Sequence, residues 1–491
     1  MLKRFVLILV LLTFTWSVPA YAEDDSLTGA STIGEVFGYI SQYHLKKPDV
    51  NELVKNSIKG MLDTLNDPYT VYFSPEELTQ FKDELNGDFE GIGVELELKD
   101  QLPHVVRVLK DTPAEQAGIQ KDDYIIAVDN QQMQGLPLSE AVKKLQGKQG
   151  TKVRLTIRRA GQPDISLELT RGTVNLPTVY HELLDNEIGY IAIDSFGMET
   201  GKEFADALRE LQDMGSRSLI IDLRDNGGGF VDAALEVASY ILGKDKTVLY
   251  TEDREKQRET YKTEFDSLID RLPLVVLVNG ESASASEILA GALQDYGRAT
   301  LIGTKTYGKG TVQDIVDLSN GGALKLTTAI YLTPKGRRID GQGLQPDRLV
   351  VTPELQLFAA KQLLHPTKLE IKFNGDGKVV LNGQELKAAN KMVNEGGNFL
   401  VPLRFTLEAL GHEIKYRSES NSIVASGKGR TWQLFFSGRN SILNGVTRVL
   451  NKAVVMKNGA AYIAAEDLRN VGAEVIVEGK DVIIKMEPNM T

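Results

Sequence analysis

The stretch Pro273–Tyr296, PLVVLVNGESASASEILAGALQDY, joins a short apolar run to a segment whose apolar residues have helical spacing. The apolar run is typical of a buried strand, and the pattern after it predicts a helix. Three serines, Ser282, Ser284 and Ser286, alternate with alanines at the junction. Serines at such a position either cap the helix or supply a nucleophile. Their spacing alone does not show which of the three serines would be the nucleophile.

The alternation of strand and helix continues on both sides, from about Arg171 to Val351. Further strand-like runs are GYIAIDSF, SLIIDLR and ATLIG, and the helical segments include GKEFADALRELQDM and DAALEVASYIL. This order of elements predicts an α/β domain, which we expect to span residues 171–355.

Two other regions precede this domain. Residues 23–82 show helical spacing in TIGEVFGYISQYH and VNELVKNSIKGMLDTL, and Pro75 is placed to begin a further helix. Such a segment is either a brace for a neighbouring domain or a homodimerisation element. Residues 83–170 change to short strands with two short helices, the first beginning near Pro113 and the second capped by Ser139.

Residues 366–491 contain an internal repeat with an offset of about sixty residues. VVLNGQEL recurs as SILNGVTRVL, so Asn382-Gly383 corresponds to Asn444-Gly445. LRFTLEALGHEIKY recurs as AEDLRNVGAEVIV, so Gly411 corresponds to Gly472. We expect two similar β-β-α-β units packed together as an α+β tandem-repeat domain.

The N-terminus and the composition indicate where the protein acts. Lys3 and Arg4 precede FVLILVLLTFTW and VPAYA, which predicts a signal peptide over residues 1–22 and an exported protein. The 491 residues carry a formal net charge of −11 and no basic stripe, which argues against nucleic-acid binding. There is no cysteine, and the five histidines lack metal-ligand spacing, so no metal or other cofactor is expected.

Two more loops of the α/β domain follow strands and carry glycines. Asp222–Phe230, DLRDNGGGF, has three consecutive glycines that allow close backbone approach, and Thr304–Gln313, TKTYGKGTVQ, places Lys309 between two glycines. A serine nucleophile needs a base, and a lysine whose pKa is lowered by burial can serve. Gln313 lies four residues after Lys309 on the same face of an extended segment, so its amide oxygen could hold the amine.

The motifs SASASEI, TYGKGTVQ and DLRDNGGG together closely resemble those of the carboxyl-terminal processing (tail-specific) serine peptidases. The resemblance runs from about Ser31 to Val351 and implies a crotonase/ClpP-like α/β protease core. Residues 83–170 resemble an inserted PDZ domain of the circularly permuted bacterial kind. The C-terminal repeats resemble the repeat domain of copper amine oxidases and of many secreted Gram-positive proteins, with no copper implied.

The resemblance assigns the catalytic roles. The family's nucleophile is the middle serine, here Ser284, its base matches Lys309, and its supporting glutamine matches Gln313. Neutral Lys309 would take the proton of Ser284 as the hydroxyl attacks a peptide carbonyl, giving an acyl-enzyme that water resolves. Backbone N–H groups of Ala285 and Gly228, with Gly227 as the alternative, are expected to stabilise the oxyanion.

Four acidic and basic residues near these loops are interpreted as structural. Glu287 lies in the first turn of the helix, where an acid is favoured, and Asp295 is expected to order the turn DYGR. Asp222 and Arg224 are expected to brace the loop with three consecutive glycines, Asp222–Phe230. A glycosidase-like pair of acids is therefore not predicted.

The expected substrate is a protein with a free C-terminus. In the PDZ-like module the sequence GIGV can form a nest of N–H groups for a carboxylate, while the following strand pairs with the peptide. The residues of this predicted binding loop are Gly91, Ile92, Gly93 and Val94.

Two other functions compete with proteolysis: a non-catalytic PDZ adaptor, and a crotonase-like enzyme acting on thioesters. Export argues against coenzyme A substrates. For the C-terminal repeats, cell-wall or partner contact and a spacer role are both open.

Overall fold

The computed structural model describes residues 23–85, 88–109, 112–175, 177–185, 187–387 and 391–488. The predicted signal peptide, residues 1–22, lies outside these ranges. The chain divides into two compact units, Met1–Ser74 with Ile315–Leu326 and Pro75–Asp314 with Thr327–Thr491. No helix within the described ranges combines the length and apolar character that crossing a bilayer requires.

The first unit contains α1 (Glu23–Tyr43), α2 (Val50–Asp63) and β1 (Val71–Phe73), which confirms the two predicted helices. Asp49 caps α2, because its Oδ1 accepts the N–H groups of Asn51 at 2.8 Å and Glu52 at 3.2 Å. β1 pairs antiparallel with the start of β18 (Ala323–Leu332), with Val71 opposite Lys325. A strand that the helical pattern did not predict therefore joins this segment to a hairpin far along the chain.

The second unit begins with the β-rich module that was expected to resemble a PDZ domain. Its elements are α3 (Pro75–Leu85), β2 (Asp88–Gly91), β3 (Val94–Lys99), β4 (Leu102–Val108), α4 (Pro113–Gln116), β5 (Tyr124–Val128), β6 (Gln131–Gln132), α5 (Leu138–Leu145), β7 (Lys152–Arg158), β8 (Ile165–Thr170) and β9 (Gly172–Asn175). The sheet has the order β3-β4-β5-β7-β8, with β6 on β5, and β2 pairs separately with β9. Pro75 and Pro113 begin helices as predicted. The cap predicted at Ser139 is wrong, because the helix already begins at Leu138 and no side chain caps it.

The α/β domain follows. Its elements are β10 (Val179–Leu184), β11 (Ile188–Ile193), α6 (Thr200–Asp213), β12 (Ser218–Asp222), α7 (Val231–Leu242), β13 (Thr247–Asp253), β14 (Arg258–Lys262), β15 (Leu274–Val278), α8 (Ala285–Asp295), β16 (Thr300–Gly303), β17 (Thr311–Asp317), β19 (Arg348–Leu349) and α9 (Pro353–Leu364). The main sheet has the order β10-β11-β12-β15-β16-β19. β10 is antiparallel to β11, and the other pairs are parallel.

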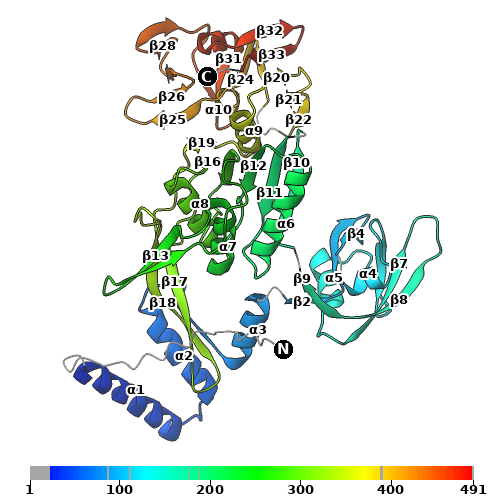
Figure 1. The fold of residues 1–491 in the computed structure, drawn as a ribbon, viewed down its shortest axis with the longest axis vertical. Coiled ribbons are helices and arrows are strands. Elements are labelled where there is room, and N and C mark those ends of the chain that lie inside the picture. The colour runs from blue at the N-terminus through cyan, green and yellow to red at the C-terminus, as the bar shows by residue number, and fades with distance from the viewer. Residues whose placement is uncertain are drawn as a thin grey trace. The chain divides into compact units, whose positions relative to one another are not determined.

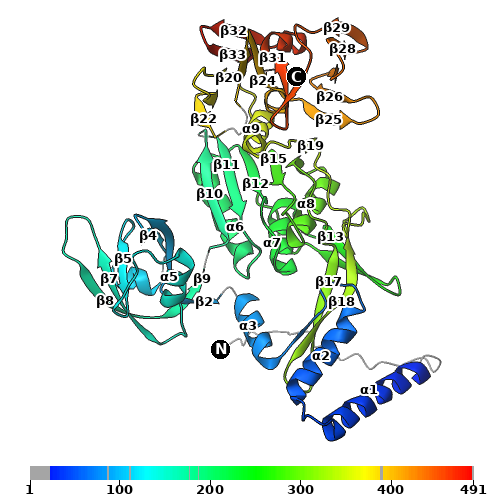
Figure 2. The same ribbon diagram turned by 180° about the vertical axis from the view of Figure 1, so that it is seen from behind.

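Alternate residues of the central strands face two different layers. Ile221 and Val276 belong to the apolar core formed with α6, α7 and α8, whereas Ile220 and Val275 belong to the core that includes α9 and the C-terminal repeats. Both faces are thus covered, which explains why β12 and β15 are buried along their whole length. The ribbon can be followed in Figures 1 and 2.

The C-terminal part consists of two corresponding halves. Its elements are β20 (Leu369–Phe373), β21 (Val379–Leu381), β22 (Gln384–Leu386), β23 (Val393–Glu395), β24 (Asn398–Pro402), α10 (Leu403–Ala409), β25 (Glu413–Arg417), β26 (Ser422–Gly427), β27 (Arg430–Phe435), β28 (Asn440–Leu443), β29 (Val446–Val449), β30 (Val455–Lys457), β31 (Ala460–Ala464), the 3₁₀ helix η1 (Ala465–Val471), β32 (Glu474–Glu478) and β33 (Asp481–Met486). Asn382-Gly383 and Asn444-Gly445 each close a hairpin with positive φ at both residues. Gly411 and Gly472 both have φ of 89° after the helix of their half. The repeat correspondence is therefore confirmed, although each half contains more strands than the predicted β-β-α-β unit and the second helix is a 3₁₀ helix.

Candidate active site

Three loops leave neighbouring parallel strands at one edge of the main sheet. Residues 223–230, the glycine loop, follow β12. Residues 279–284, the serine loop, follow β15, and residues 304–310, the lysine loop, follow β16. β15 pairs in parallel with both β12 and β16, so the three carboxyl ends lie side by side. The loops that carry the predicted site residues therefore converge where α/β folds place their sites.

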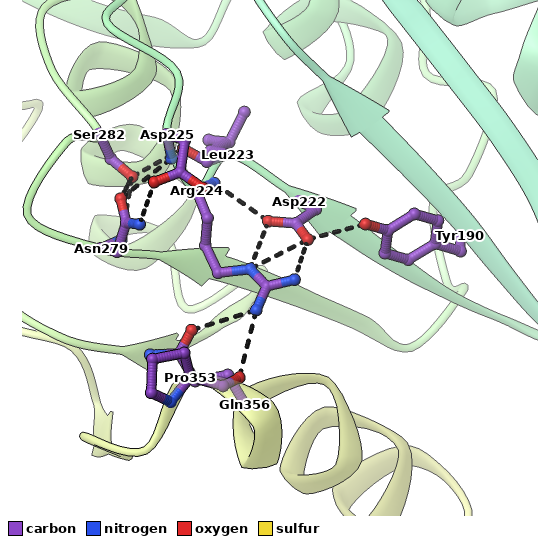
Figure 3. Close-up of polar contacts among 9 residues, drawn as sticks. All are labelled: Tyr190, Asp222, Leu223, Arg224, Asp225, Asn279, Ser282, Pro353 and Gln356. Atoms are coloured by element: carbon purple, nitrogen blue, oxygen red, sulfur yellow. Dashed lines mark hydrogen bonds and ion pairs between the residues drawn. The ribbon is translucent and has the colours of Figure 1, made fainter. Parts of the chain in front are cut away.

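The glycine loop and the serine loop are joined by a reciprocal pair of hydrogen bonds (Figure 3). Asn279 Nδ2 donates to Asp225 Oδ1 at 2.8 Å, and the Asp225 N–H donates to Asn279 Oδ1 at 3.0 Å. In addition, the Ala283 N–H donates to the carbonyl oxygen of Asn226 at 3.0 Å. The two loops therefore form one framework next to Ser284.

Asp222 and Arg224 support the base of this framework, as the sequence predicts. Arg224 Nε lies 2.9 Å from Oδ1 and 3.0 Å from Oδ2 of Asp222, and the Tyr190 hydroxyl donates to Asp222 Oδ2 at 2.8 Å (Figure 3). Arg224 Nη1 also donates to Gln356 Oε1 of α9 at 3.2 Å. These bonds connect the loop to the strand below it and to the helix on the far face.

Asp295 is also structural, but the turn predicted for it is wrong. Its Oδ2 accepts the Lys335 N–H at 2.8 Å, and its Oδ1 pairs with Arg337 Nη2 at 2.6 Å. The side chain therefore anchors the segment after β18 instead of the DYGR turn after α8.

The three alternating serines differ in their surroundings. Ser282 and Ser286 are buried, and their hydroxyls donate to the carbonyl oxygens of Leu223 at 2.7 Å and Asn226 at 3.0 Å. Ser284 is only partly buried. Two of the serines thus bind the glycine loop to the serine loop, and the middle one remains accessible.

The backbone of Ser284 is unusual. Its φ of 55° and ψ of −116° lie outside the regions that L-residues ordinarily occupy. This conformation places Ser284 at the junction before α8, whose N-terminal end favours negative charge. Strained backbone of this kind persists where the surrounding structure enforces it, and it is common in active sites.

Glu287 links this serine to the lysine loop. The fully buried carboxylate accepts the N–H groups of Ser284 at 3.0 Å, Lys309 at 2.9 Å and Gly308 at 2.8 Å, and the hydroxyl of Thr306 at 2.5 Å. Burial raises the pKa of Glu287, and these hydrogen bonds act in the opposite direction. The structural interpretation of Glu287 is confirmed, but its contact with the lysine loop was not predicted.

The backbone of Lys309 is fixed on both sides. Its N–H donates to Glu287 Oε2, and its carbonyl oxygen accepts the hydroxyl of Tyr331. Its neighbours must be glycines, since a Cβ on Gly310 would lie 2.2 Å from the backbone nitrogen of Asp340, and a Cβ on Gly308 would lie 2.9 Å from that of Gly343. The side chain is partly buried. The flanking glycines therefore allow the close approach that the sequence suggested.

Gln313 lies on β17, beside β18. Its Nε2 donates to the hydroxyl oxygens of Thr311 at 2.8 Å and Thr327 at 3.4 Å. These two bonds leave the amide oxygen as the atom that could receive the lysine amine. The role assigned to Gln313 stays a prediction.

The glycine loop lies directly against the start of α8. Gly228 has φ of 103°, and a Cβ there would lie 2.8 Å from Ser284 Cβ and 3.0 Å from the backbone nitrogen of Ala285. The Gly228 N–H donates to Asn226 Oδ1 at 2.8 Å, so it must leave Asn226 before it can bind an oxyanion. The choice between Gly228 and Gly227 as donor stays open, as does the role of Ala285.

The predicted carboxylate loop of the β-rich module precedes an edge strand. Gly91 ends β2, Ile92 is buried, Gly93 has φ of 87°, and Val94 begins β3. β3 is the outermost strand of its sheet, beside α5. An edge strand is what an added peptide strand requires.

Comparison with known proteins agrees with this arrangement. Residues 187–350 match peptidase family S41, residues 104–159 a PDZ domain, residues 19–77 the N-terminal domain of activating protease CtpB, and residues 380–486 the copper amine oxidase N-terminal domain. The four matches follow one another along the chain in the same order as the four regions predicted after residue 22.

Relatives that match most of the chain are also found. Carboxy-terminal processing protease CtpA of Bacillus subtilis is 36% identical over 386 residues, which cover 79% of this chain and 78% of the relative. CtpB of the same organism is 36% identical over 75% of this chain and 78% of its own length. The carboxy-terminal-processing protease of Bartonella bacilliformis is 36% identical over 70% of this chain and 80% of its own length. The chain therefore belongs to the carboxy-terminal processing proteases of peptidase family S41 and is a serine-type peptidase.

Proposed function

We propose that this protein is an exported endopeptidase that binds the free C-terminus of a protein substrate and cleaves it with a Ser284–Lys309 dyad. The observation that carries the proposal is the shared carboxylate of Glu287, which receives the N–H groups of both residues. A dyad needs its two members held in fixed relation, and this contact supplies that constraint.

In the proposed reaction, the neutral amine of Lys309 accepts the hydroxyl proton of Ser284 while Oγ attacks the scissile carbonyl carbon. The tetrahedral intermediate collapses, the leaving amine takes the proton, and an acyl-enzyme forms. Water then adds to the ester with the same amine as base, and the second tetrahedral intermediate collapses, releasing the new carboxyl terminus while the lysine returns the proton to Ser284 Oγ. Main-chain N–H groups at Ala285 and in the glycine loop would receive the oxyanion, each contributing about 3 kcal/mol in the transition state.

The accessibility of Ser284 supports its choice over Ser282 and Ser286, because the latter two hydroxyls are buried and donate to carbonyl oxygens. We propose that the amide oxygen of Gln313 positions the amine of Lys309.

Substrate capture is proposed for the β-rich module. The PDZ match and the edge position of β3 support binding of a peptide strand, and the loop Gly91–Val94 is proposed to receive the terminal carboxylate. Tail binding is proposed to open the active site, as a gate would. An amidated tail should then be a poor substrate and activator, and equal cleavage of acid and amide tails would refute this step.

The decisive experiment on the dyad compares wild type, Ser284→Ala and Lys309→Ala on one protein with a susceptible C-terminal tail. We expect both variants to lose hydrolysis while retaining tail binding. Ser282→Ala is the matched control and should keep measurable activity. Hydrolysis by Ser284→Ala at the wild-type rate would exclude the proposed nucleophile.

We further propose that the helical segment forms a homodimer. Ile33, Val36 and Met61 are about half exposed and line an apolar groove between α1 and α2. Light scattering should then give a dimer mass for wild type and a monomer mass for Ile33→Asp/Met61→Asp. For the C-terminal repeats, cell-wall or partner contact and a spacer role all stay predictions.

A further inference from the structure

A cluster of cations surrounds a buried histidine where the C-terminal repeats meet β19. We call Arg348, Lys428 and Arg430, together with His412, the cation cluster. Arg348 lies on β19, Lys428 in the turn between β26 and β27, and Arg430 at the start of β27. His412 follows α10 and is 3% exposed.

The imidazole of His412 lacks the hydrogen bonds that a buried ring normally makes. Among the described residues, neither Nδ1 nor Nε2 has a partner. Buried polar atoms are bonded in the great majority of cases, and binding of an ion or water is one explanation of an exception. Burial, with Lys428, Arg430 and Arg348 adding to it, lowers the pKa of His412 to about 4, so the ring is neutral near pH 7.

The three cations approach one another closely. The Cβ position of Gly411 is 3.0 Å from Lys428 Cε and 3.4 Å from Arg348 Nη2. Burial, then Arg348 and Arg430, lowers the pKa of Lys428, and burial lowers the pKa of Arg348. In the described part of the chain, none of the three forms an ion pair with a carboxylate, and the contact recorded for the Lys428 ammonium is with Met486 Sδ at 3.0 Å.

Glutamates also lie near the cluster, and two of them have other partners. Glu487 pairs with Lys368 at 2.6 Å, and Glu408 accepts the backbone N–H of Thr352 at 2.9 Å and pairs with Arg404. Glu474 and Glu487 line the hollow that Lys428 and Arg430 also line, and Glu408 and Glu487 line the one beside Arg348. Within the ranges that the structure describes, none of these carboxylates forms an ion pair with a cation of the cluster.

Two hollows give access to the cations of the cluster, whereas the buried His412 lines neither of them. Lys428 lines two hollows, one of about 210 Å³ shared with Arg430 and Gly472, and one of about 190 Å³ shared with Arg348 and Gly411. Guanidinium groups donate two parallel hydrogen bonds to oxyanions, and the ammonium and a protonated imidazole add further donors.

We infer that the cation cluster binds a tetrahedral oxyanion, a phosphate or sulfate group, either free or as an ester on another molecule. Arg348, Lys428 and Arg430 supply the charge, and His412 donates from one ring nitrogen after taking up a proton. Because Arg348 belongs to the protease domain and the other members to the repeats, the anion would fasten the two to each other.

The test is titration of sodium sulfate into the full chain, with sodium chloride adjusted to constant ionic strength. We expect saturable binding by wild type and at least about tenfold weaker binding by Arg348→Gln/Lys428→Gln, since two charge-assisted donors are lost. Lys415→Gln/Arg448→Gln removes two exposed charges elsewhere in the repeats and should bind as wild type does. If all three proteins responded equally to sulfate, the response would be general salt stabilisation and not binding at the cation cluster. That result would overturn the inference.

Thermal unfolding distinguishes binding from a structural role of the cations. Without sulfate, Arg348→Gln/Lys428→Gln should be at least as stable as wild type, because repulsion is removed. With sulfate, wild type should become the more stable. If the variant were less stable than wild type in both buffers and bound sulfate with unchanged affinity, Arg348 and Lys428 would have only a structural role. That result would refute the binding site.

A pH series tests the part assigned to His412. Sulfate stays dianionic between pH 5 and pH 8, so tighter binding at pH 5 would report proton uptake by the protein. Arg348, Lys428 and Arg430 are the charged groups acting on the ring, and all three disfavour its protonation until the anion binds. His412→Asn should bind with a flatter pH profile. Glycerol phosphate and inorganic phosphate, compared at one pH, distinguish an ester from a free anion.

Discussion

The backbone nitrogens of Ser284 and Lys309 both donate to one oxygen atom, Oε2 of Glu287, at 3.0 and 2.9 Å. The two residues lie on different loops, after β15 and after β16, and the pairing of these strands brings the loops together. A single buried carboxylate thus sets the distance between the proposed nucleophile and the proposed base.

Replacement of Glu287 by alanine should therefore reduce turnover much more than tail binding. Four donors lose their acceptor, which should lower the free energy of unfolding by about 2–5 kcal/mol. We expect kcat to fall by about 10²-fold or more with KM nearly unchanged, because the dyad geometry is lost. Steady-state kinetics on a tailed protein measures both constants.

Glu287→Gln should fail to restore activity, because its amide nitrogen would face N–H donors. Glu281→Gln, an exposed change on the same loop, is the control and should behave as wild type. Wild-type kcat in Glu287→Gln would show that the carboxylate does not position the dyad.

The three serines should separate activity from stability. Ser284→Ala should lose about 10⁴-fold or more in kcat without loss of thermal stability. Ser282→Ala and Ser286→Ala should each lose about 1 kcal/mol of stability, because a carbonyl oxygen in the interior loses one of its two hydrogen bonds, and should retain activity. Thermal unfolding and hydrolysis measured on the same preparations provide the comparison. The reverse pattern would assign catalysis to another serine.

Gly228→Ala should displace the nucleophile. The added methyl group would lie 2.8 Å from Ser284 Cβ, and a shift of about 1 Å at a reacting group can cost about 10²-fold in rate. Gly215→Ala is a matched control, since Gly215 also has positive φ (90°) but open space around its Cβ position. Equal kinetics of the two variants would show that contact with Ser284 is unimportant.

The depressed pKa of His412 predicts acid sensitivity of the C-terminal repeats. The unfolded chain binds this proton below about pH 6.5 and the folded chain only below about pH 4, so stability falls as pH decreases through that window. The full shift corresponds to at most about 3 kcal/mol. His412→Gln should show a flatter dependence in chloride buffer than wild type, with exposed His44→Gln as the control. Parallel curves for wild type and His412→Gln would contradict the assignment.

Much of the architecture could be predicted from the sequence because local patterns carry it. The apolar run Leu274–Val278 became a wholly buried strand, and the Asn-Gly pairs of the repeats became hairpin turns. Capping was less predictable: Ser139 lies inside its helix because the chain turns helical one residue earlier.

The site depended on contacts between loops, which sequence spacing does not encode. The choice of Ser284 came from family resemblance, and the burial of its two neighbours becomes visible only when the glycine loop packs against them. Glu287 carried one local signal, an acid in the first helical turn, which does not report its bond to Lys309. Asp295 pairs with Arg337, which lies beyond β18 and far from it in the sequence. The prediction that Asp295 orders the nearby turn DYGR was wrong because sequence proximity does not report such a partner.

Trapping of the acyl-enzyme tests the dyad most directly. An activated peptide ester, mixed with enzyme and quenched in acid within one turnover, should leave the acyl group on the peptide that contains Ser284, as mass spectrometry would show. Lys309→Ala should form this adduct at least about 10³-fold more slowly, since the general base is absent. An acyl group on another residue, or acylation of Lys309→Ala at the wild-type rate, would contradict the account.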